Sequence, residues 1–291
     1  MSFKNLINNI KFMARADLRQ YIKQSIDLPQ LYDNLVYEIA DVVKNENVKS
    51  VLGIMDSLEY LVQSESSIIR FGDGEINLMC GTSIPFQHAD TLLATRLKQA
   101  LSVCDKKLMI GIPSALYKSK TDMEPYARDF WRANGNKFRQ TLEQYINFNK
   151  NSYYAAEITL GFSNSCIDKS LYFSKFRSIW ANKDIVIVCG DRVFDKITYN
   201  IFDNAKSIQY IYTPSTDAFS AYDTILNECL SVKNKIFVVI CGPTAKILCH
   251  DLFINGKRAL DLGHIAKSYD WYKKDKTLDS LHSGENFFAP D

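Results

Sequence analysis

The stretch Ser67–Glu75 reads SIIRFGDGE, an apolar run that breaks into a glycine-rich acidic turn. The apolar half is typical of a buried strand. In an extended segment residues i and i+2 point to the same side, so we expect Asp73 and Glu75 to address one ligand together, while Gly72 and Gly74 allow close approach. A divalent cation on a diphosphate fits this arrangement, because Mg²⁺ commonly takes one or two carboxylates and substrate phosphates. An ordinary acidic turn, with Asp73 capping a helix, fits equally well.

The composition bounds the size and the class of the protein. The chain has 291 residues, of which 46% are hydrophobic, so we expect one main domain with appendages. Lys plus Arg (35) nearly balance Asp plus Glu (33), which argues against nucleic acid as a partner. The seven cysteines form no CxxC pair and indicate a reducing compartment. No apolar run approaches the roughly 18 residues that span a bilayer, and there is no signal-peptide core, so a cytoplasmic protein is expected.

Residues 1–50 are predicted to form a helical extension. Apolar residues recur at helical spacing over residues 1–23, and the opposite face carries Lys4, Lys11, Arg15, Arg19 and Lys23. Such a helix either docks on its own domain or lies peripherally on the inner face of an anionic membrane. The main domain is expected over residues 51–272, and a polar tail over residues 273–291.

The second half of the chain has the rhythm of a parallel sheet. Short runs rich in Ile, Val and Tyr, separated by segments long enough for a helix, occupy residues 184–188, 208–212, 236–240 and 258–262. Strands that alternate with helices predict an α/β fold with a mostly parallel sheet. Ligands of such sheets bind beyond the carboxyl ends of the strands, so we look for chemistry in the turns that follow each run.

Two of these turns are candidate anion sites. In the Gly242 turn the glycine ends a strand, Pro243 suits the first turn of a helix, and Thr244 offers a hydroxyl beside backbone N–H groups. An ordinary strand-to-helix turn is the alternative. Arg192, after the run at residues 184–188, is either a phosphate clamp or part of a structural ion pair.

Several ordered motifs resemble the GT-D-type glycosyltransferases, and the resemblance covers residues 57–272. The motifs are RFGDGE at residues 70–75, Gln87, Asp90, GPTA at 242–245, DLGH at 261–264 and YDW at 269–271. The resemblance implies a Rossmann-like sheet flanked by helices and a nucleotide-sugar donor such as a UDP-sugar. It also implies a DxE motif, here Asp73 and Glu75, that supports Mn²⁺ or Mg²⁺. Such enzymes typically elongate bacterial surface or protein-linked glycans, which implies hexose transfer to a lipid- or protein-linked acceptor.

The chain departs from the family pattern at three positions that are usually acidic. Cys189, Ala266 and Ser268 stand there instead. A divergent branch with a different donor or acceptor, and a partly degenerate scaffold that binds nucleotide sugars without catalysis, both remain open. Retention of the two DxE acids and of His264 favours divergence.

Roles can be assigned to the expected site. Cleavage of a sugar–phosphate bond builds negative charge on the leaving diphosphate, which a metal, a helix N-terminus and an arginine can stabilise. Catalysis is assigned to Glu75 and to His264, a base that titrates near neutrality, with Asp261 behind it; a structural histidine is the alternative. A Mg²⁺-dependent phosphotransferase or phosphohydrolase is the competing enzyme class. The expected donor-binding residues are Arg70, Gly72, Gly74, Arg192, Gly242, Pro243 and Thr244.

Overall fold

The computed structural model describes residues 31, 51–117, 125–163, 166–233, 235–276 and 287. The predicted helices of residues 1–50, with their membrane or docking role, and most of the tail predicted after residue 272 lie outside these residues. Among the described residues, no helix is both long enough and apolar enough to cross a membrane.

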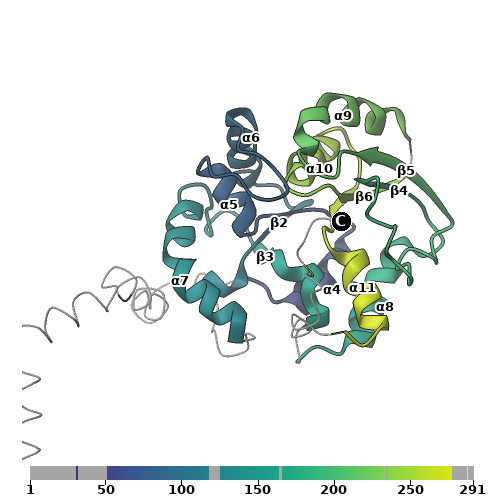
Figure 1. Ribbon diagram of the computed structural model, residues 1–291, viewed down its shortest axis with the longest axis horizontal. Helices are drawn as coiled ribbons and strands as arrows, with labels where there is room; N and C mark the ends of the chain where they lie inside the picture. The colour runs from purple at the N-terminus through teal and green to yellow at the C-terminus, as the bar shows by residue number, and fades with distance from the viewer. Residues whose placement is uncertain are drawn as a thin grey trace, which may run out of the picture.

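Seven strands form one sheet in the order β3-β2-β1-β7-β6-β4-β5 (Figure 1). Every neighbouring pair in this sheet is parallel. The predicted parallel α/β architecture is therefore confirmed. The strands are β1 (Ser67–Arg70), β2 (Leu108–Ile112), β3 (Tyr153–Ala155), β4 (Asp184–Gly190), β5 (Ser207–Thr213), β6 (Ile236–Ile240) and β7 (Ala259–Asp261).

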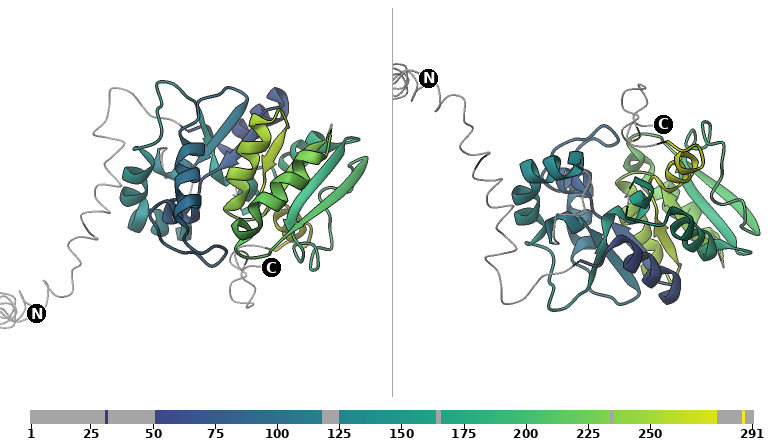
Figure 2. Two further views of the ribbon diagram at one scale, coloured as in Figure 1. Left: turned by 90° about the horizontal axis from the view of Figure 1, so that it is seen from above. Right: turned by 90° about the horizontal axis from the view of Figure 1, so that it is seen from below.

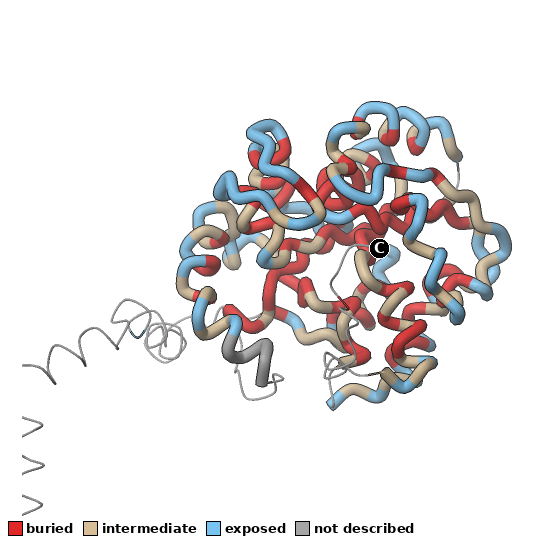
Figure 3. Tube along the Cα trace, in the orientation of Figure 1, coloured by how far each residue is buried: buried red, intermediate tan, exposed pale blue. Residues whose placement is uncertain are grey.

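Helices cover both faces of the sheet because its central strands are apolar on both sides. Ile68 and Ile69 illustrate this, since these neighbours on β1 are both fully buried but belong to two different hydrophobic clusters. Figures 1 and 2 show the two helical layers, and Figure 3 shows the buried centre between them. One layer contains α5 (Asp73–Met79), α6 (Thr91–Leu101), α7 (Pro125–Leu142), α9 (Tyr222–Ser231) and α10 (Thr244–Ile254). The other contains α4 (Ile54–Ser64), α8 (Lys169–Trp180) and α11 (Ile265–Lys273).

The order of the strands decides which turns meet. β1 lies between β2 and β7, and β6 follows β7, so segments from both ends of the chain become neighbours at the centre of the sheet. The carboxyl ends of β1, β6 and β7 lead into α5, α10 and α11 respectively. This edge is where a parallel sheet places its ligands.

Candidate functional site

Three buried charges and one largely buried charge meet at the carboxyl ends of the central strands. Arg70 ends β1, Asp261 ends β7, and Glu75 and Lys246 lie in the first turns of α5 and α10. Arg70 Nη2 lies 3.1 Å from Asp261 Oδ1. Lys246 Nζ lies 2.8 Å from Glu75 Oε1 and 3.4 Å from Asp261 Oδ2. Two cations and two carboxylates balance, as buried charges must. We call these residues the central quartet.

Lys246 was missed by the sequence analysis, although it is the cation that joins the two helix starts. Its Nζ also donates to the Gly242 carbonyl at 3.2 Å, so it is tied to the predicted anion-binding turn. Burial alone would lower the pKa of Lys246, but the carboxylates of Asp261 and Glu75 raise it instead. The side chain therefore remains charged inside the protein.

Arg70, expected to bind the donor, is committed to the protein itself. Its Nε donates to the Asp261 carbonyl at 2.7 Å, and its Nη1 donates to the Ala156 carbonyl at 2.9 Å and to Thr159 Oγ1 at 3.0 Å. Gly263 passes close above it, with a φ of 42°, and a Cβ added there would lie 2.4 Å from Arg70 Nη2. Arg70 thus holds the ends of β1 and β7 together beneath a turn that requires glycine.

The geometry predicted for Asp73 and Glu75 is wrong, because they do not lie in an extended segment. Helix α5 begins at Asp73, so the two residues are separated by about 200° around its axis. Glu75 is buried and turns back to accept the Gly72 N–H at 2.8 Å, as in a capping box. Asp73 is exposed at the edge of the site. Partial desolvation, followed by repulsion from Glu75, raises the pKa of Asp73.

Only one of the two residues predicted to bind a divalent cation is available to do so. The described residues hold no group of three or more His, Cys, Asp or Glu side chains that could bind a metal ion. One oxygen of Glu75 is paired with Lys246 and the other accepts the Gly72 N–H, so this carboxylate is already occupied. Asp73 is accessible and, together with the phosphates of a substrate, could supply the sparse ligation that Mg²⁺ accepts.

The Gly242 turn opens helix α10 as predicted. Gly242 has a φ of 59°, a left-handed conformation that favours glycine, and Pro243 directly precedes the first helical residue. Thr244 is fully buried, and its hydroxyl donates to Gln87 Oε1 at 3.4 Å. The hydroxyl therefore supports the loop that carries Gln87, and does not reach solvent.

The loop of residues 86–88 is hydrogen-bonded to the turn after β5, and we call it the strap. Gln87 Nε2 and the His88 N–H donate to Asp217 Oδ1 at 3.1 and 2.6 Å, and the Asp217 N–H donates to the Phe86 carbonyl at 2.9 Å. Gln87 belonged to the family-like motifs, but sequence alone did not connect it to Asp217, 130 positions away. The strap brings Phe86 beside the Gly242 turn.

His264 lies among aromatic rings at the start of α11. Its ring centroid is 6.4 Å from that of Phe86 and 5.4 Å from that of Phe287. Burial, followed by the charge of Arg70, lowers the pKa of His264 to about 3, so the imidazole is neutral at neutral pH. A group with so low a pKa is a weak general base. The carboxylate of Asp261, expected behind it, is held by the quartet cations, and this favours the structural alternative for His264.

Arg192 and the three positions that depart from the family pattern lie in contrasting surroundings. Arg192 is 67% exposed in the turn after β4, where Nε lies 3.5 Å from Asp195 Oδ2, a weak surface pair that leaves it able to reach a ligand. Cys189, Ala266 and Ser268 are buried, and the Ser268 hydroxyl donates to the Thr159 carbonyl at 2.7 Å. The missing acids are thus replaced by groups that the core accommodates.

The fold is that of a parallel α/β protein, a class that typically binds ligands at the carboxyl ends of its strands. The family described as "Glycosyltransferase GT-D fold" matches residues 68–281. The chain belongs to this family of glycosyltransferases, and the resemblance inferred from its motifs is confirmed.

Named relatives and solved structures agree with this assignment. The chain is 31% identical over 277 residues to "Probable glycosyl transferase Gly" of Streptococcus gordonii, covering 91% of this chain and 40% of that protein. It is 31% identical over 254 residues to "Glycosyltransferase GlyD" of Streptococcus pneumoniae serotype 4, covering 84% and 31% respectively. This chain spans less than half the length of these two relatives.

Two of the similar solved structures carry glycosyltransferase titles. One is titled "The highly conserved domain of unknown function 1792 has a distinct glycosyltransferase fold", with a TM-score of 0.75, 33% identity, and coverage of 85% of this chain and 87% of that one. The other, "A New Glycosyltransferase (DUF1792) from Streptococcus sanguinis", has a TM-score of 0.71, 33% identity, and coverage of 78% and 86%.

Proposed function

We propose that this protein transfers a hexose from a UDP-sugar to a lipid- or protein-linked glycan acceptor of the bacterial surface. The observation that carries the proposal is the meeting of two helix starts at one edge of the sheet. The 2.8 Å contact between Glu75 and Lys246 joins the first turns of α5 and α10. Helix N-termini carry partial positive charge and favour anions, so this edge suits a diphosphate.

The residues of the edge divide into those that contact the donor and those that position them. The Gly242 turn and Arg192 would bind the diphosphate, and their positive potential stabilises the charge that builds up as the sugar leaves. Asp73 would hold Mn²⁺ or Mg²⁺, which when bound supplies further neutralisation of the diphosphate. The central quartet fixes the starts of both helices. We therefore assign Glu75 to positioning, through Lys246, and not to metal binding.

The experiment that tests this function measures nucleotide release and sugar transfer. The protein is incubated with a panel of nucleotide sugars and Mn²⁺, with and without chelator, and with short glycans as acceptors. We expect release of UDP and loss of that release with chelator. Release of inorganic phosphate from sugar-free phosphoesters would instead favour a phosphohydrolase, and donor binding without turnover would favour a non-catalytic scaffold.

A further inference from the structure

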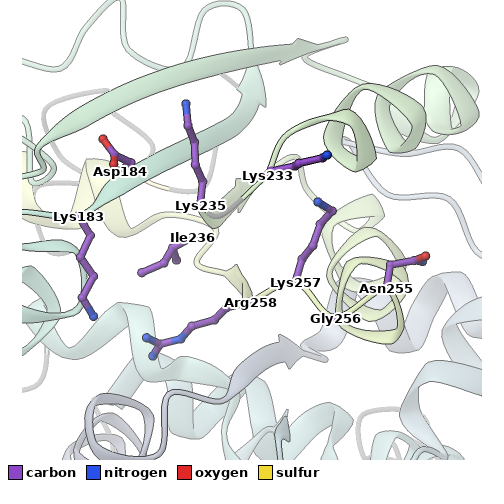
Figure 4. A pocket seen from close by; sticks show the side chains of 9 residues that line it. All are labelled: Lys183, Asp184, Lys233, Lys235, Ile236, Asn255, Gly256, Lys257 and Arg258. Atoms are coloured by element: carbon purple, nitrogen blue, oxygen red, sulfur yellow. The ribbon is translucent and has the colours of Figure 1, made fainter.

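A hollow unrelated to the family motifs lies at the opposite edge of the sheet, and we call it the basic hollow. It has a volume of about 530 Å³ and lies beside the amino ends of β4, β6 and β7 (Figure 4). This volume falls in the range of small-molecule sites, about 300 to 1,000 Å³. Its walls are formed by Lys183, Asp184, Lys233, Lys235, Ile236, Asn255, Gly256, Lys257 and Arg258.

The basic hollow concentrates positive charge on a nearly neutral protein. Five cationic side chains and one carboxylate line it, an excess of four positive charges on a chain whose net charge is +2. Nearby ion pairs leave this excess unchanged: Glu65 lies 3.6 Å from Lys183, and Lys206 lies 3.5 Å from Asp184. A local field of this sign attracts anions regardless of the overall charge.

Contacts with the protein hold several of these cations in place. Lys235 Nζ donates to Gln209 Oε1 at 2.9 Å, and Lys257 Nζ donates to the Val232 carbonyl. Arg258 Nη2 donates to the Leu61 carbonyl at 3.0 Å. Each ammonium carries three N–H donors and each guanidinium five, so these contacts leave donors available for a ligand.

The cations approach the hollow from two sides. In Figure 4, Lys183 and Arg258 end on one side and Lys233 and Lys257 on the other, with Lys235 rising between them. Only an extended ligand with several negative charges spans the two sides.

We propose that the basic hollow binds a phosphate-bearing ligand with at least three negative charges, at a site separate from the sugar donor. Lysine is a common phosphate ligand, because it presents a compact charge. The five residues of β6 separate the hollow from the Gly242 turn by roughly 17 Å, so a ligand here would not occupy the donor site. The same chemistry is offered by a soluble polyphosphorylated compound and by clustered phospholipid headgroups.

Tripolyphosphate binding, measured by isothermal titration at about 0.1 M salt, tests the proposal. The test variant, Lys183→Gln with Lys233→Gln, removes one exposed cation from each side. The control, Lys106→Gln with Lys150→Gln, removes two exposed lysines that do not line the hollow. We expect the test variant to bind at least about tenfold more weakly and the control to change less than about twofold, because screened surface charges act only over about 10 Å. Equal losses in both variants would overturn the proposal.

Vesicles distinguish the two sources of phosphate. Sedimentation with vesicles of phosphatidylglycerol and phosphatidylcholine, lost in the test variant but kept in the control, would assign the hollow to phospholipid headgroups. Tripolyphosphate binding without sedimentation would assign it to a soluble ligand. If the wild-type protein binds neither probe, the proposal is wrong. Nucleotide release should be unchanged in the test variant, so failure of the donor-site assignment would be seen separately.

Discussion

The contact between Lys246 and Glu75 gives the sharpest test of how the site is built. In Lys246→Met the aliphatic stem remains, but Glu75 and Asp261 keep only Arg70 as a buried counter-ion. Breaking a buried ion pair by removing one partner typically costs about 3 to 5 kcal/mol, because the other charge is left uncompensated. We expect a loss of this size in the free energy of unfolding, measured with urea.

A double-mutant cycle isolates the pair. Glu75→Gln retains a side-chain oxygen that can accept the Gly72 N–H. The three charges that remain, on Lys246, Arg70 and Asp261, then sum to +1. Combining it with Lys246→Met leaves a single balanced pair, Arg70 with Asp261. We therefore expect the double variant to lose less than the sum of the single variants, by at least about 1 kcal/mol.

An exposed lysine serves as the control, and additivity of the two losses is the result that would refute the reasoning. Lys206→Met removes a lysine that lies 3.5 Å from Asp184 but is 68% exposed, so it should cost at most about 1 kcal/mol. If the losses in Lys246→Met and Glu75→Gln add within about 0.5 kcal/mol, the buried pair does not hold the two helix starts together. Turnover carries separate information: a double variant that regains stability but not activity would show that Lys246 or Glu75 also acts directly toward the donor.

Three further predictions concern single residues. Asp73→Ala should lower turnover by about 10²-fold without changing the urea midpoint, and chelator should have no further effect on the variant. Turnover that is unchanged both in this variant and in wild-type protein treated with chelator would remove the metal from the proposal. Gly263→Ala should cost about 1 to 3 kcal/mol in thermal unfolding, because its Cβ would meet Arg70 Nη2 at 2.4 Å and its φ is 42°; an unchanged Tm would refute this. Although desolvation opposes the change, the pKa of Asp251 is lowered to about 2 by hydrogen bonds from His250, Tyr222 and Arg96. A carboxyl group whose pKa is lowered by folding stabilises the folded state at pH values above its unfolded pKa of 3.8. This contribution should therefore be lost as the pH falls from about 4 to 2. Asp251→Asn should flatten that part of the curve of unfolding free energy against pH.

Local sequence patterns predicted most of the fold. The apolar runs at residues 67–71 and 236–240 became buried strands β1 and β6, because a strand buried on both faces must be apolar at nearly every position. Asp90 caps α6, its side chain accepting the Leu93 N–H at 2.8 Å, as its place before an apolar periodic segment predicts. The error at Asp73 and Glu75 was also local. Gly72 is a residue type accepted at N-caps, and a glutamate three residues later can bond back to its N–H, so this spacing indicates a helix start at Asp73.

The sequence by itself determined the class of fold and the family, and it predicted the edge of the sheet where we place the candidate site, because strand periodicity, turn chemistry and ordered motifs are properties of short segments. Only the tertiary structure decided which charges meet. Arg70 and Asp261 are 191 positions apart, and Lys246 resembles any surface lysine until the strand order places α10 against α5. Burial then decides what each side chain can do. Glu75 is paired with a lysine, whereas Asp73, two residues away, still reaches solvent. The physical reason is that helix α5, which begins at Asp73, turns one side chain inward and the other outward.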